Sequence, residues 1–529
     1  MILDEDDVVG NICMIRVDSS WSFAEVRRKI YEKEKYIFER LKIPPSEISI
    51  YTTLPHRVKT SVEGSKPIVP LYKVGTICHQ LNPDDMSIHL VLVARPLAYP
   101  IIPAKRRPST TEDEVLKRIK TQKIALNSPS NYAHASTFAR LQTIAEHRVL
   151  NDRPVSEPEI APIALLYDGF GVLTDMLAAE ESENVHAEKD AKFFTLVRDF
   201  ADAMCLYYAD DLARMNAGLR FLQKIFNDGR ECDINDPNPD PDCICVRRAD
   251  ADGNSKTDGN SVCVTGAADL MFKFKNEQGT SGDPVPEGVS YIAHFHRMAV
   301  EESSVNEKLY SGWRVPSLLV TVAGAVITFH AVVAMGNYRV VPLTPPMWLV
   351  SPTGSSNDMV YRRMLIRAFK VAVFVRQKIR EDTAKMRELA SRDGLTSLSL
   401  KEMYLPNIIS VTSTTAGSPP LGTKILEVLL SREDRLVYFA KRLDADQEYI
   451  IIKVTRRYTR ELHEFCAERG HAPRLLGFDR VSDGWSIVAM EYVQGQSLLE
   501  SHGYLTEWRD GLKKVVDEFH SKGLVHGDL

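Results

Sequence analysis

Residues 315–336 read VPSLLVTVAGAVITFHAVVAMG and contain no Asp, Glu, Lys or Arg. This stretch is about as long as the roughly 20 residues that a helix needs to cross a bilayer, so a transmembrane helix is one interpretation. Val, Ile and Thr are frequent in it, however, and Gly324 divides it near its middle. β-Branched side chains favour strands over helices. We therefore predict two buried strands joined at the Ala-Gly-Ala sequence, and no membrane span.

The composition of the whole chain predicts a globular protein of several domains. Its 529 residues exceed one ordinary hydrophobic core, since domains have roughly 150 residues, and predict about three or four units. Charged residues make up 26% and apolar residues 44%, which excludes a wholly disordered chain. The net charge is only -5, so any site for a polyanion must be local. The 8 cysteines are too sparse for a disulfide framework, and their spacing does not fit a zinc site.

Patterns on both sides of the strand pair predict a mixed α/β domain at residues 137–395. The segment FFTLVRDFADAMCLYYADDLARMNAGLRFLQKIF precedes the pair and YRRMLIRAFKVAVFVRQKIREDTAKMREL follows it, and both carry apolar side chains at helical spacing. The segments ADLMFKFK and YRVVPL are predicted to be further strands. Residues 227–260 are rich in Asp, Asn, Gly and Pro, which predicts a long surface loop.

Composition also indicates the domain boundaries. Pro, Ser or Thr are frequent in residues 99–136 and 396–421, which are predicted linkers. Residues 1–98 contain the strand-like segments ICMIRVD, EISIY and SIHLVLVAR, and residues 21–41 carry apolar side chains at helical spacing. Strand, helix, strand, strand is the order of a ubiquitin-like roll, although several small α+β folds share it. The acidic start MILDEDDVVG lacks the positive region of a conventional secretory signal.

The middle domain contains part of a nuclease pattern. Metal-dependent nucleases of the restriction-endonuclease-like fold place an Asp on one strand and an acid-x-Lys sequence on the next, because two carboxylates hold Mg²⁺ while the Lys positions the attacking water. Here Asp242 precedes a strand that ends in Lys273-Phe274-Lys275. Lys273 occupies the acid position, and its ammonium would repel the metal. The alternative for this strand is an exposed sheet edge whose lysines hinder aggregation.

A rebuilt metal site with other carboxylates is a further alternative. Lys275 would then be the retained lysine of the pattern. Coordination requires that the carboxylates converge on one face of the fold, which the sequence alone does not establish. The candidate carboxylates are Asp168, Asp242, Asp269 and Glu277.

A second pattern lies in residues 422–529. The strand YIIIKV ends near Lys453 and leads into the helical segment RRYTRELHEFCAERG, which carries Glu461 and Glu464. A strand lysine held by a helix glutamate is the arrangement with which protein-kinase-like folds bind nucleotide phosphates. A predicted hairpin, the hinge-like sequence MEYV with Glu491 and Val493, and a further helix then lead to HGDL, which contains Asp528. This order predicts the first part of a kinase-like fold.

Three parts of the chain resemble the Crinkler-type effector family. The segments EISIY and LNPDDMSIHLVLVARP resemble its ubiquitin-like header, the Lys-Asn-Glu run after ADLMFKF resembles its restriction-endonuclease-like middle domain, and HEFCAERGHAPRLLGFDR resembles the kinase-like domain of fungal members. The resemblance implies a multidomain α+β protein. Its parts would be a header at 1–98, a degenerate nuclease-like domain at 137–395, and a partial kinase-like N-lobe with the start of a C-lobe at 422–529.

The same resemblance implies roles for individual residues. Lys453 would bind the phosphates of ATP, and Glu461, or alternatively Glu464, would pair with it. Glu491 and Val493 would contact the nucleotide from the hinge. Asp528 would be the catalytic base that accepts the proton of the substrate hydroxyl. No metal ligand is assigned from the nuclease pattern, because Lys273 stands where the pattern has an acidic residue.

Two departures predict that the kinase-like part is catalytically incomplete. The sequence Ser-Arg-Glu-Asp at 431–434 stands where a glycine-rich loop would approach the phosphates. The sequence also stops before a catalytic-loop Asn and an Asp-Phe-Gly segment, which hold Mg²⁺ in kinases. We therefore expect weak or absent ATP binding, whereas a complete domain would be an ATP- and Mg²⁺-dependent Ser/Thr-type kinase. A non-catalytic interaction protein and a metal-dependent nuclease are the alternative functions.

By family resemblance, we expect a protein that is secreted without a conventional signal peptide and delivered into a host cell. If the chain does not share the family's secretion and delivery, the cytoplasm or the nucleus is the expected location. A host or cellular protein is the expected partner, and the middle domain is a possible contact for nucleic acid.

Overall fold

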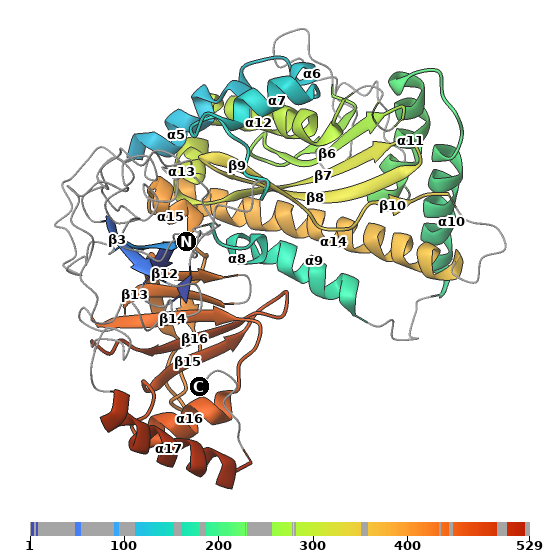
Figure 1. The fold of residues 1–529 in the computed structure, drawn as a ribbon. Helices are drawn as coiled ribbons and strands as arrows, with labels where there is room; N and C mark the ends of the chain where they lie inside the picture. Colours follow the sequence, from blue (N-terminus) through green and yellow to red (C-terminus); the bar gives the residue numbers. More distant parts are fainter. Residues whose placement is uncertain are drawn as a thin grey trace, which may run out of the picture. The chain divides into compact units, whose positions relative to one another are not determined.

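The computed structural model of the chain is a mixed α+β structure (Figure 1). The chain forms two units, which are Pro108–Val493 and a second one that combines Met1–Arg107 with Gln494–Leu529. The structure describes residues 2–4, 7–8, 48–53, 89–94, 112–152, 160–179, 187–227, 229, 257–277, 279, 282–350, 358–432, 435–443, 448–494 and 505–523.

The described strands of the first 98 residues form a four-stranded sheet in the order β2-β1-β4-β3. Its strands are β1 (Ile2–Asp4), β2 (Asp7–Val8), β3 (Ile48–Thr53) and β4 (His89–Ala94). β1 is parallel to β4 and antiparallel to β2, while β3 is antiparallel to β4. The strands predicted at EISIY and SIHLVLVAR are confirmed, whereas the strand predicted at ICMIRVD and the helix predicted at 21–41 lie outside the described residues. Near the other end of the chain, α17 spans Leu505–Ser521.

A six-stranded mixed sheet forms the middle of the larger unit. Its order is β10-β8-β7-β6-β5, and β9 also pairs with β8. β6 and β7 are parallel, and the other pairs are antiparallel. The strands are β5 (Gly259–Val262), β6 (Ala268–Lys275), β7 (Val315–Ala323), β8 (Val326–Met335), β9 (Asn337–Pro342) and β10 (Met347–Trp348).

The uncharged segment at 315–336 is therefore a strand pair, as predicted. β7 and β8 are antiparallel neighbours, and almost all of their residues are buried. Gly324 lies in the turn between them with a φ of 57°, a conformation that glycine adopts without steric cost. In the part of the chain that the structure describes, we find no helix with the length and apolarity needed to cross a membrane.

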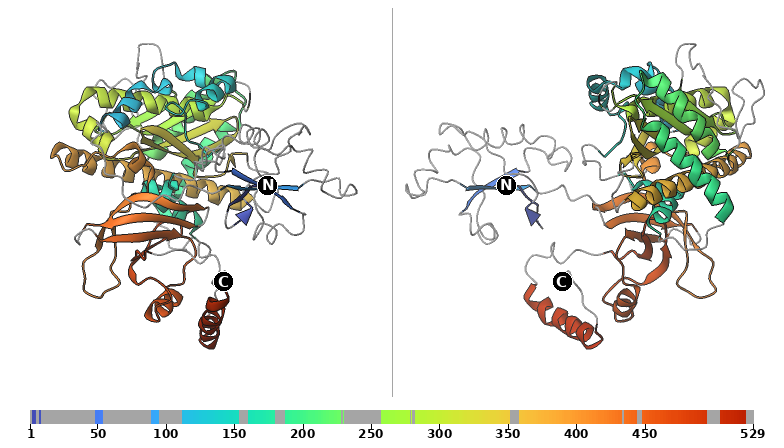
Figure 2. Two further views of the ribbon diagram at one scale, coloured as in Figure 1. Left: turned by 60° about the vertical axis from the view of Figure 1, so that its left-hand side comes forward. Right: turned by 90° about the vertical axis from the view of Figure 1, so that its right-hand side faces the viewer.

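Helices cover both faces of this sheet (Figures 1 and 2). The crossover between the parallel strands β6 and β7 contains α12 (Pro284–Glu302) and α13 (Ser304–Gly312). α12 packs on one face, against β6, β7 and β9, and α14 (Asp358–Ser391) lies under the other face in Figure 1. The described helices that precede β5 in the chain are α5 (Glu112–Thr121), η3 (Lys123–Ala125), α6 (Pro129–Tyr132), α7 (Ala135–Gln142), α8 (Ile163–Leu166), α9 (Asp168–Ala178), α10 (Ala187–Met204) and α11 (Asp211–Phe226).

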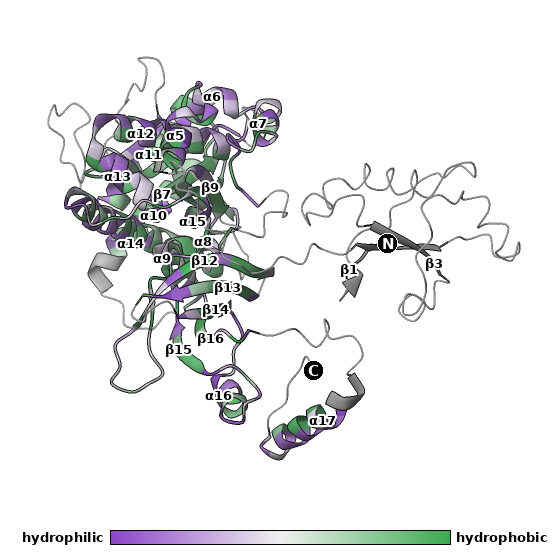
Figure 3. Cartoon of the chain, turned by 90° about the vertical axis from the view of Figure 1, so that its left-hand side faces the viewer, coloured by the Kyte–Doolittle hydropathy of each residue, from purple (hydrophilic) through white to green (hydrophobic). Residues whose placement is uncertain are grey.

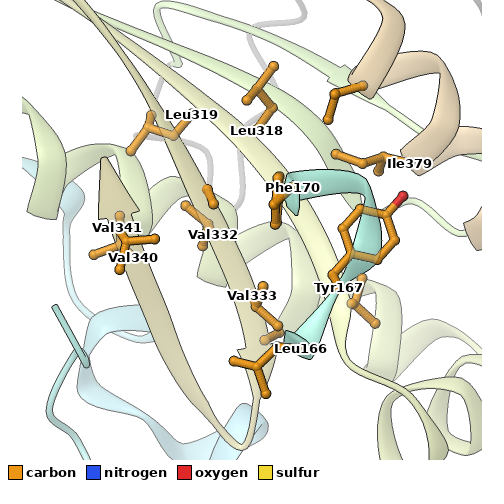
Figure 4. Close-up of a cluster of buried hydrophobic side chains, with 14 of the residues drawn as sticks. Leu166, Tyr167, Phe170, Leu318, Leu319, Val332, Val333, Val340, Val341 and Ile379 are labelled. Carbon is orange, nitrogen blue, oxygen red and sulfur yellow. The ribbon is translucent and has the colours of Figure 1, made fainter. Parts of the chain in front are cut away.

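Large apolar side chains fill the space between the sheet and α14. Phe369 of α14 makes edge-to-face contacts with Phe200, Phe226 and Phe329 at centroid distances of 5.5, 6.4 and 5.3 Å. Such pairs contribute about 0.5–1.5 kcal/mol each beyond the area they bury. Figure 4 shows a neighbouring part of this core, where side chains of α8 and α9 lie beside strand residues and Ile379 of α14. The helix predicted from the sequence at 361–389 is thus confirmed.

A second six-stranded sheet lies toward the C-terminal side of the larger unit. All of its pairs are antiparallel, in the order β11-β12-β13-β14-β16-β15. Its strands are β11 (Ser410–Val411), β12 (Leu421–Arg432), β13 (Arg435–Arg442), β14 (Tyr449–Thr455), β15 (Leu475–Arg480) and β16 (Ser486–Glu491). α16 (Arg460–Glu468) connects β14 with β15. Hydrophobic and hydrophilic residues interleave along these strands (Figure 3), as expected for a sheet with one buried face.

The segment predicted as a linker at 396–421 contains two short elements. α15 (Leu400–Tyr404) begins at a capping box, in which the side chains of Ser399 and Glu402 each accept a hydrogen bond from the other's backbone N–H. β11 then pairs with β12. Met403 and Val411 are fully buried, so this segment packs onto the rest of the larger unit.

Candidate functional site

Polar side chains from neighbouring strands share one face of the middle sheet. Lys273 of β6 lies opposite Thr321 of β7, and Thr321 lies opposite Thr328 of β8. Residues directly opposite one another in a sheet point to the same face. This is the face that α12 covers, because Glu287 of α12 contacts Lys273.

Glycine at one position lets α12 approach the sheet closely. Asp283 is the N-cap of this helix, and its side chain accepts a hydrogen bond from the Val285 N–H. A Cβ atom at Gly288 would lie 2.5 Å from Cδ1 of Leu319, which is fully buried in β7. The absence of a side chain at Gly288 therefore allows the neighbouring Glu287 to reach the lysines of β6.

Five charged residues form a charge cluster around the two lysines of β6, namely Asp211, Asp258, Lys273, Lys275 and Glu287, of which Asp211 at the start of α11 is partly exposed. Lys273 Nζ lies 2.9 Å from Asp258 Oδ2 and 2.9 Å from Glu287 Oε1. Lys275 Nζ lies 2.8 Å from Glu287 Oε2 and 3.8 Å from Asp211 Oδ2. Lys273 is 5% exposed, Lys275 is 6% exposed and Glu287 is 3% exposed. Buried charges of this kind persist only when they are paired.

The cluster keeps Lys273 positively charged. Burial alone would lower the pKa of Lys273, but the carboxylates of Asp258 and Glu287 outweigh it and hold the pKa above its usual value. Burial raises the pKa of Asp258, against the opposing effect of the Lys273 ammonium and the Phe274 N–H. The cluster thus contains a permanent ammonium between two carboxylates.

This ammonium occupies the position that a metal ion would need. A divalent cation held by both Asp258 and Glu287 would lie between their oxygens, where Lys273 Nζ now donates to each. In the described ranges, no group of three or more His, Cys, Asp or Glu side chains is arranged to hold a metal ion. The arrangement is therefore a closed ion-pair network with a cation supplied by the chain itself.

The carboxylates that the sequence suggested for a rebuilt metal site are engaged elsewhere. Asp168 accepts a hydrogen bond from Ser482 at 2.9 Å. Asp269 binds both Arg376 and Arg380 at 3.2 Å. Glu277 pairs at 3.1 Å with Arg214, whose guanidinium is almost completely buried. Asp242 lies outside the described residues.

Sequence reasoning identified Lys273 and Lys275 but missed their partners. Asp258 directly precedes β5, and Glu287 lies in the first turn of the helix after β6. An Asp-Pro helix start followed by a Glu was a visible signal for the latter. The edge-strand interpretation of ADLMFKFK is wrong, because β6 lies between β5 and β7 and both lysines are buried.

A cavity of about 720 Å³ lies between β7, β8 and the start of α12. Thr321, Thr328 and His330 line it from the strands, and Glu277 lies at its side. His330 Nε2 is 3.0 Å from Thr321 Oγ1. Burial lowers the pKa of His330 to about 4, so its imidazole is neutral at pH 7. The polar groups that the strands contribute to the cavity are thus uncharged, and they lie among apolar side chains such as Val326.

The predicted kinase-like residues lie on the second sheet. Lys453 is half-buried in the middle of β14, between Val437 of β13 and Val488 of β16. Its ammonium lies 5.9 Å from the ring centre of Tyr458. The other face of β14 carries Ile450, Ile452 and Val454, which are fully buried. The face with Lys453 is therefore the more open one.

The proposed partners of Lys453 on α16 have other surroundings. Glu464 binds Arg460 of its own helix at 2.7 Å, and Glu461 is exposed in the first turn. Glu491 pairs with Arg474 at 3.0 Å. Val493 is largely exposed. Asp528 lies outside the described residues.

Comparisons with known proteins returned no relative. No family model, no curated protein and no solved structure matches the chain. Functional inference therefore depends on the geometry of the two sheets and on the sequence patterns.

Proposed function

We propose that this chain is a Crinkler-type effector that acts by binding a partner, and that its nuclease-like and kinase-like parts do not perform catalysis. The observation that carries this proposal is the Lys273 ammonium between Asp258 and Glu287. A nuclease of this type needs a divalent cation at such a carboxylate pair to activate water. The ammonium neutralises the carboxylates but offers no vacant coordination position.

The topology of the middle sheet supports a restriction-endonuclease-like origin. Two parallel strands, β6 and β7, are joined by a helical crossover, and an antiparallel strand flanks each of them. The lysines of the charge cluster lie on β6, where the acid-x-Lys pattern of such enzymes would lie, and its carboxylates come from α11, α12 and the residue before β5. Likewise, the order β2-β1-β4-β3 with a parallel central pair supports a ubiquitin-like header.

A metal-binding experiment tests the main proposal. Wild type, Lys273→Glu and Lys273→Gln are titrated with Mn²⁺ by calorimetry, after circular dichroism has verified that each is folded. We expect no Mn²⁺ binding by the wild type and measurable binding by Lys273→Glu, because the substitution replaces the internal cation with a third carboxylate. Lys275→Gln is the matched control, since it retains Lys273 between the carboxylates and should gain no site.

A plasmid-nicking assay with Mg²⁺ provides the contradicting outcome. Cleavage by the wild type that disappears in Lys275→Ala would favour the alternative of a working nuclease. Absence of cleavage by the wild type, with Mn²⁺ binding gained only after Lys273 is replaced, is the result that the proposal requires.

A second function that the sequence pattern would imply is nucleotide binding by the C-terminal sheet, and we propose that this binding is weak or absent. The order β12-β13-β14-β16-β15, with α16 after β14, supports a kinase-like N-lobe with Lys453 facing the nucleotide. In the Val-Ala-Ile-Lys sequence of kinases, the residue two before the lysine is small. Here that position is Ile451, which shares the face of Lys453, so its larger side chain projects toward the space for a base. We therefore propose that ATP binds weakly or not at all.

Fluorescence titration with a methylanthraniloyl derivative of ATP checks this second candidate. We expect no micromolar affinity for the wild type, and tighter binding by Ile451→Ala. Lys453→Met is the control that should cancel any gain. Micromolar, Mg²⁺-dependent binding by the wild type would contradict the proposal and support an ATP-dependent kinase that uses Asp528 as its base.

The proposed biological setting follows from the family resemblance. We propose secretion without a conventional signal peptide, delivery into a host cell, and a host protein as the partner. The resemblance of the first 98 residues to the Crinkler-type header supports this setting. Detection of the tagged protein inside host cells, with and without residues 1–98, would test it.

A further inference from the structure

A narrow slot lies between α10 and α14, beside β10. Its volume is about 180 Å³, which suits one large side chain. The buried parts of its wall are Val197 of α10, Leu365 of α14, and Leu349, which directly follows β10. Trp348 and Tyr361 also line it, and they are 62% and 49% exposed. The slot is thus an apolar recess with aromatic side chains open to solvent, and we call it the α10–α14 slot.

Exposed apolar side chains are concentrated around this slot. Val350 and Val360 are also exposed, and Met364 follows Tyr361 by about one helical turn. Isolated exposed apolar residues are ordinary on a protein surface, but a contiguous group around a recess indicates an interaction site. Tyr and Trp are the residue types that most often dominate the affinity of protein interfaces.

The helix that forms one side of the slot is strongly basic. Residues 359–380 contain seven Lys or Arg and no Asp or Glu. Arg376 and Arg380 bind the buried Asp269, whereas Lys370 lies near the slot, with its Nζ 4.8 Å from the ring centre of the lining residue Phe194. Arg198 and Arg362 line the slot, together with the single carboxylate of Asp202. The exposed Arg363 lies next to them in the sequence. This local positive charge complements an acidic partner.

We propose that the α10–α14 slot binds an acidic peptide segment of a partner protein, with one large apolar side chain of the peptide inserted beside Trp348 and Tyr361. A peptide fits better than a nucleic acid because the slot walls are mostly apolar and its volume suits a single inserted side chain. The slot is on the α14 side of the sheet, whereas Glu287 binds the lysines from the α12 side. The proposal therefore stands independently of whether the charge cluster supports catalysis.

Peptide selection on the whole chain tests the proposal. A display library of random twelve-residue peptides is selected on the immobilised wild type, and the enriched peptides are synthesised with a fluorescein label. We expect sequences with several Asp or Glu residues around one aromatic or large aliphatic residue. Trp348→Ala and Arg363→Glu should each weaken their binding about tenfold or more, as measured by fluorescence anisotropy.

Phe374→Ala is the matched control, because Phe374 is an exposed aromatic residue of the same helix that does not line the slot. Its affinity for the peptides should stay within about twofold of the wild type. Failure to enrich any peptide, or enrichment of peptides that bind Trp348→Ala as tightly as the wild type, would overturn the proposal. A fluorescein-labelled oligo-dT of fifteen nucleotides is tested in parallel. Its binding, if it depended on Trp348, would assign the slot to nucleic acid and reject the peptide.

Discussion

Two lysines near the middle of strands show how burial decides what the same side chain can do. Lys273 on β6 is 5% exposed and lies 2.9 Å from carboxylates on two other elements. Lys453 on β14 is half-buried on the open face of its sheet, with the Tyr458 ring 5.9 Å away. The first lysine is part of an internal ion-pair network, whereas the second remains partly exposed on its sheet. A strand lysine is therefore a functional candidate only when its partners leave it accessible.

The largest expected effect comes from the same substitution at the two lysines. Lys273→Met leaves buried carboxylates without their cation and should lower the free energy of unfolding by about 3–5 kcal/mol. Lys453→Met should lower it by only about 1 kcal/mol or less, because this half-buried side chain leaves no fully buried charge unpaired when it is replaced. Urea unfolding followed by circular dichroism measures both. Equal effects at the two positions would contradict the difference that we infer between the sheets.

A smaller effect is expected where α12 approaches the charge cluster. Gly288→Ala would bring a Cβ atom to within 2.5 Å of Leu319, so it should destabilise the fold by about 1–3 kcal/mol. Gly511→Ala in α17 is the control, because no atom lies within 4 Å of the added Cβ. Thermal unfolding of the two variants would check this. If Gly288→Ala were as stable as the control, α12 would not be held close to the sheet in the way described.

The smallest expected effect concerns His330 on the same face as Lys273. Burial lowers its pKa to about 4 from 6.5, so between these values the unfolded chain binds more protons than the folded one. The contribution of neutral His330 to stability is therefore complete above about pH 6.5 and is lost as the pH falls toward 4. We expect a loss of about 2 kcal/mol by pH 5.

Urea unfolding at several pH values between 7.5 and 4.5 measures this loss. His330→Gln should have a flatter profile than the wild type, because it removes the group that titrates. His296 remains in the variant, and burial lowers its pKa to about 3, so part of the acid sensitivity should persist. Identical profiles for the two proteins would show that His330 does not titrate as described.

Local sequence patterns predicted many of the elements correctly. The β-branched content around Gly324 predicted β7 and β8, helical spacing predicted α14, and strand and helix patterns predicted β14 with α16 after it. These predictions succeeded because side-chain periodicity and turn residues act within about ten residues. The same reasoning misjudged ADLMFKFK as a possible edge strand, because the sequence of a strand does not by itself determine which other strands pair with it.

The sequence alone determined that Lys273 and Lys275 alternate on one strand, and that Lys453 precedes a helix with two glutamates. Only the tertiary structure decided which carboxylates meet these lysines. Asp258 and Glu287 come from different elements, and they converge because the parallel pairing of β6 with β7 forces a helical crossover onto this face of the sheet. Coulomb energy depends on distance and burial, and these arise from packing between segments far apart in the chain.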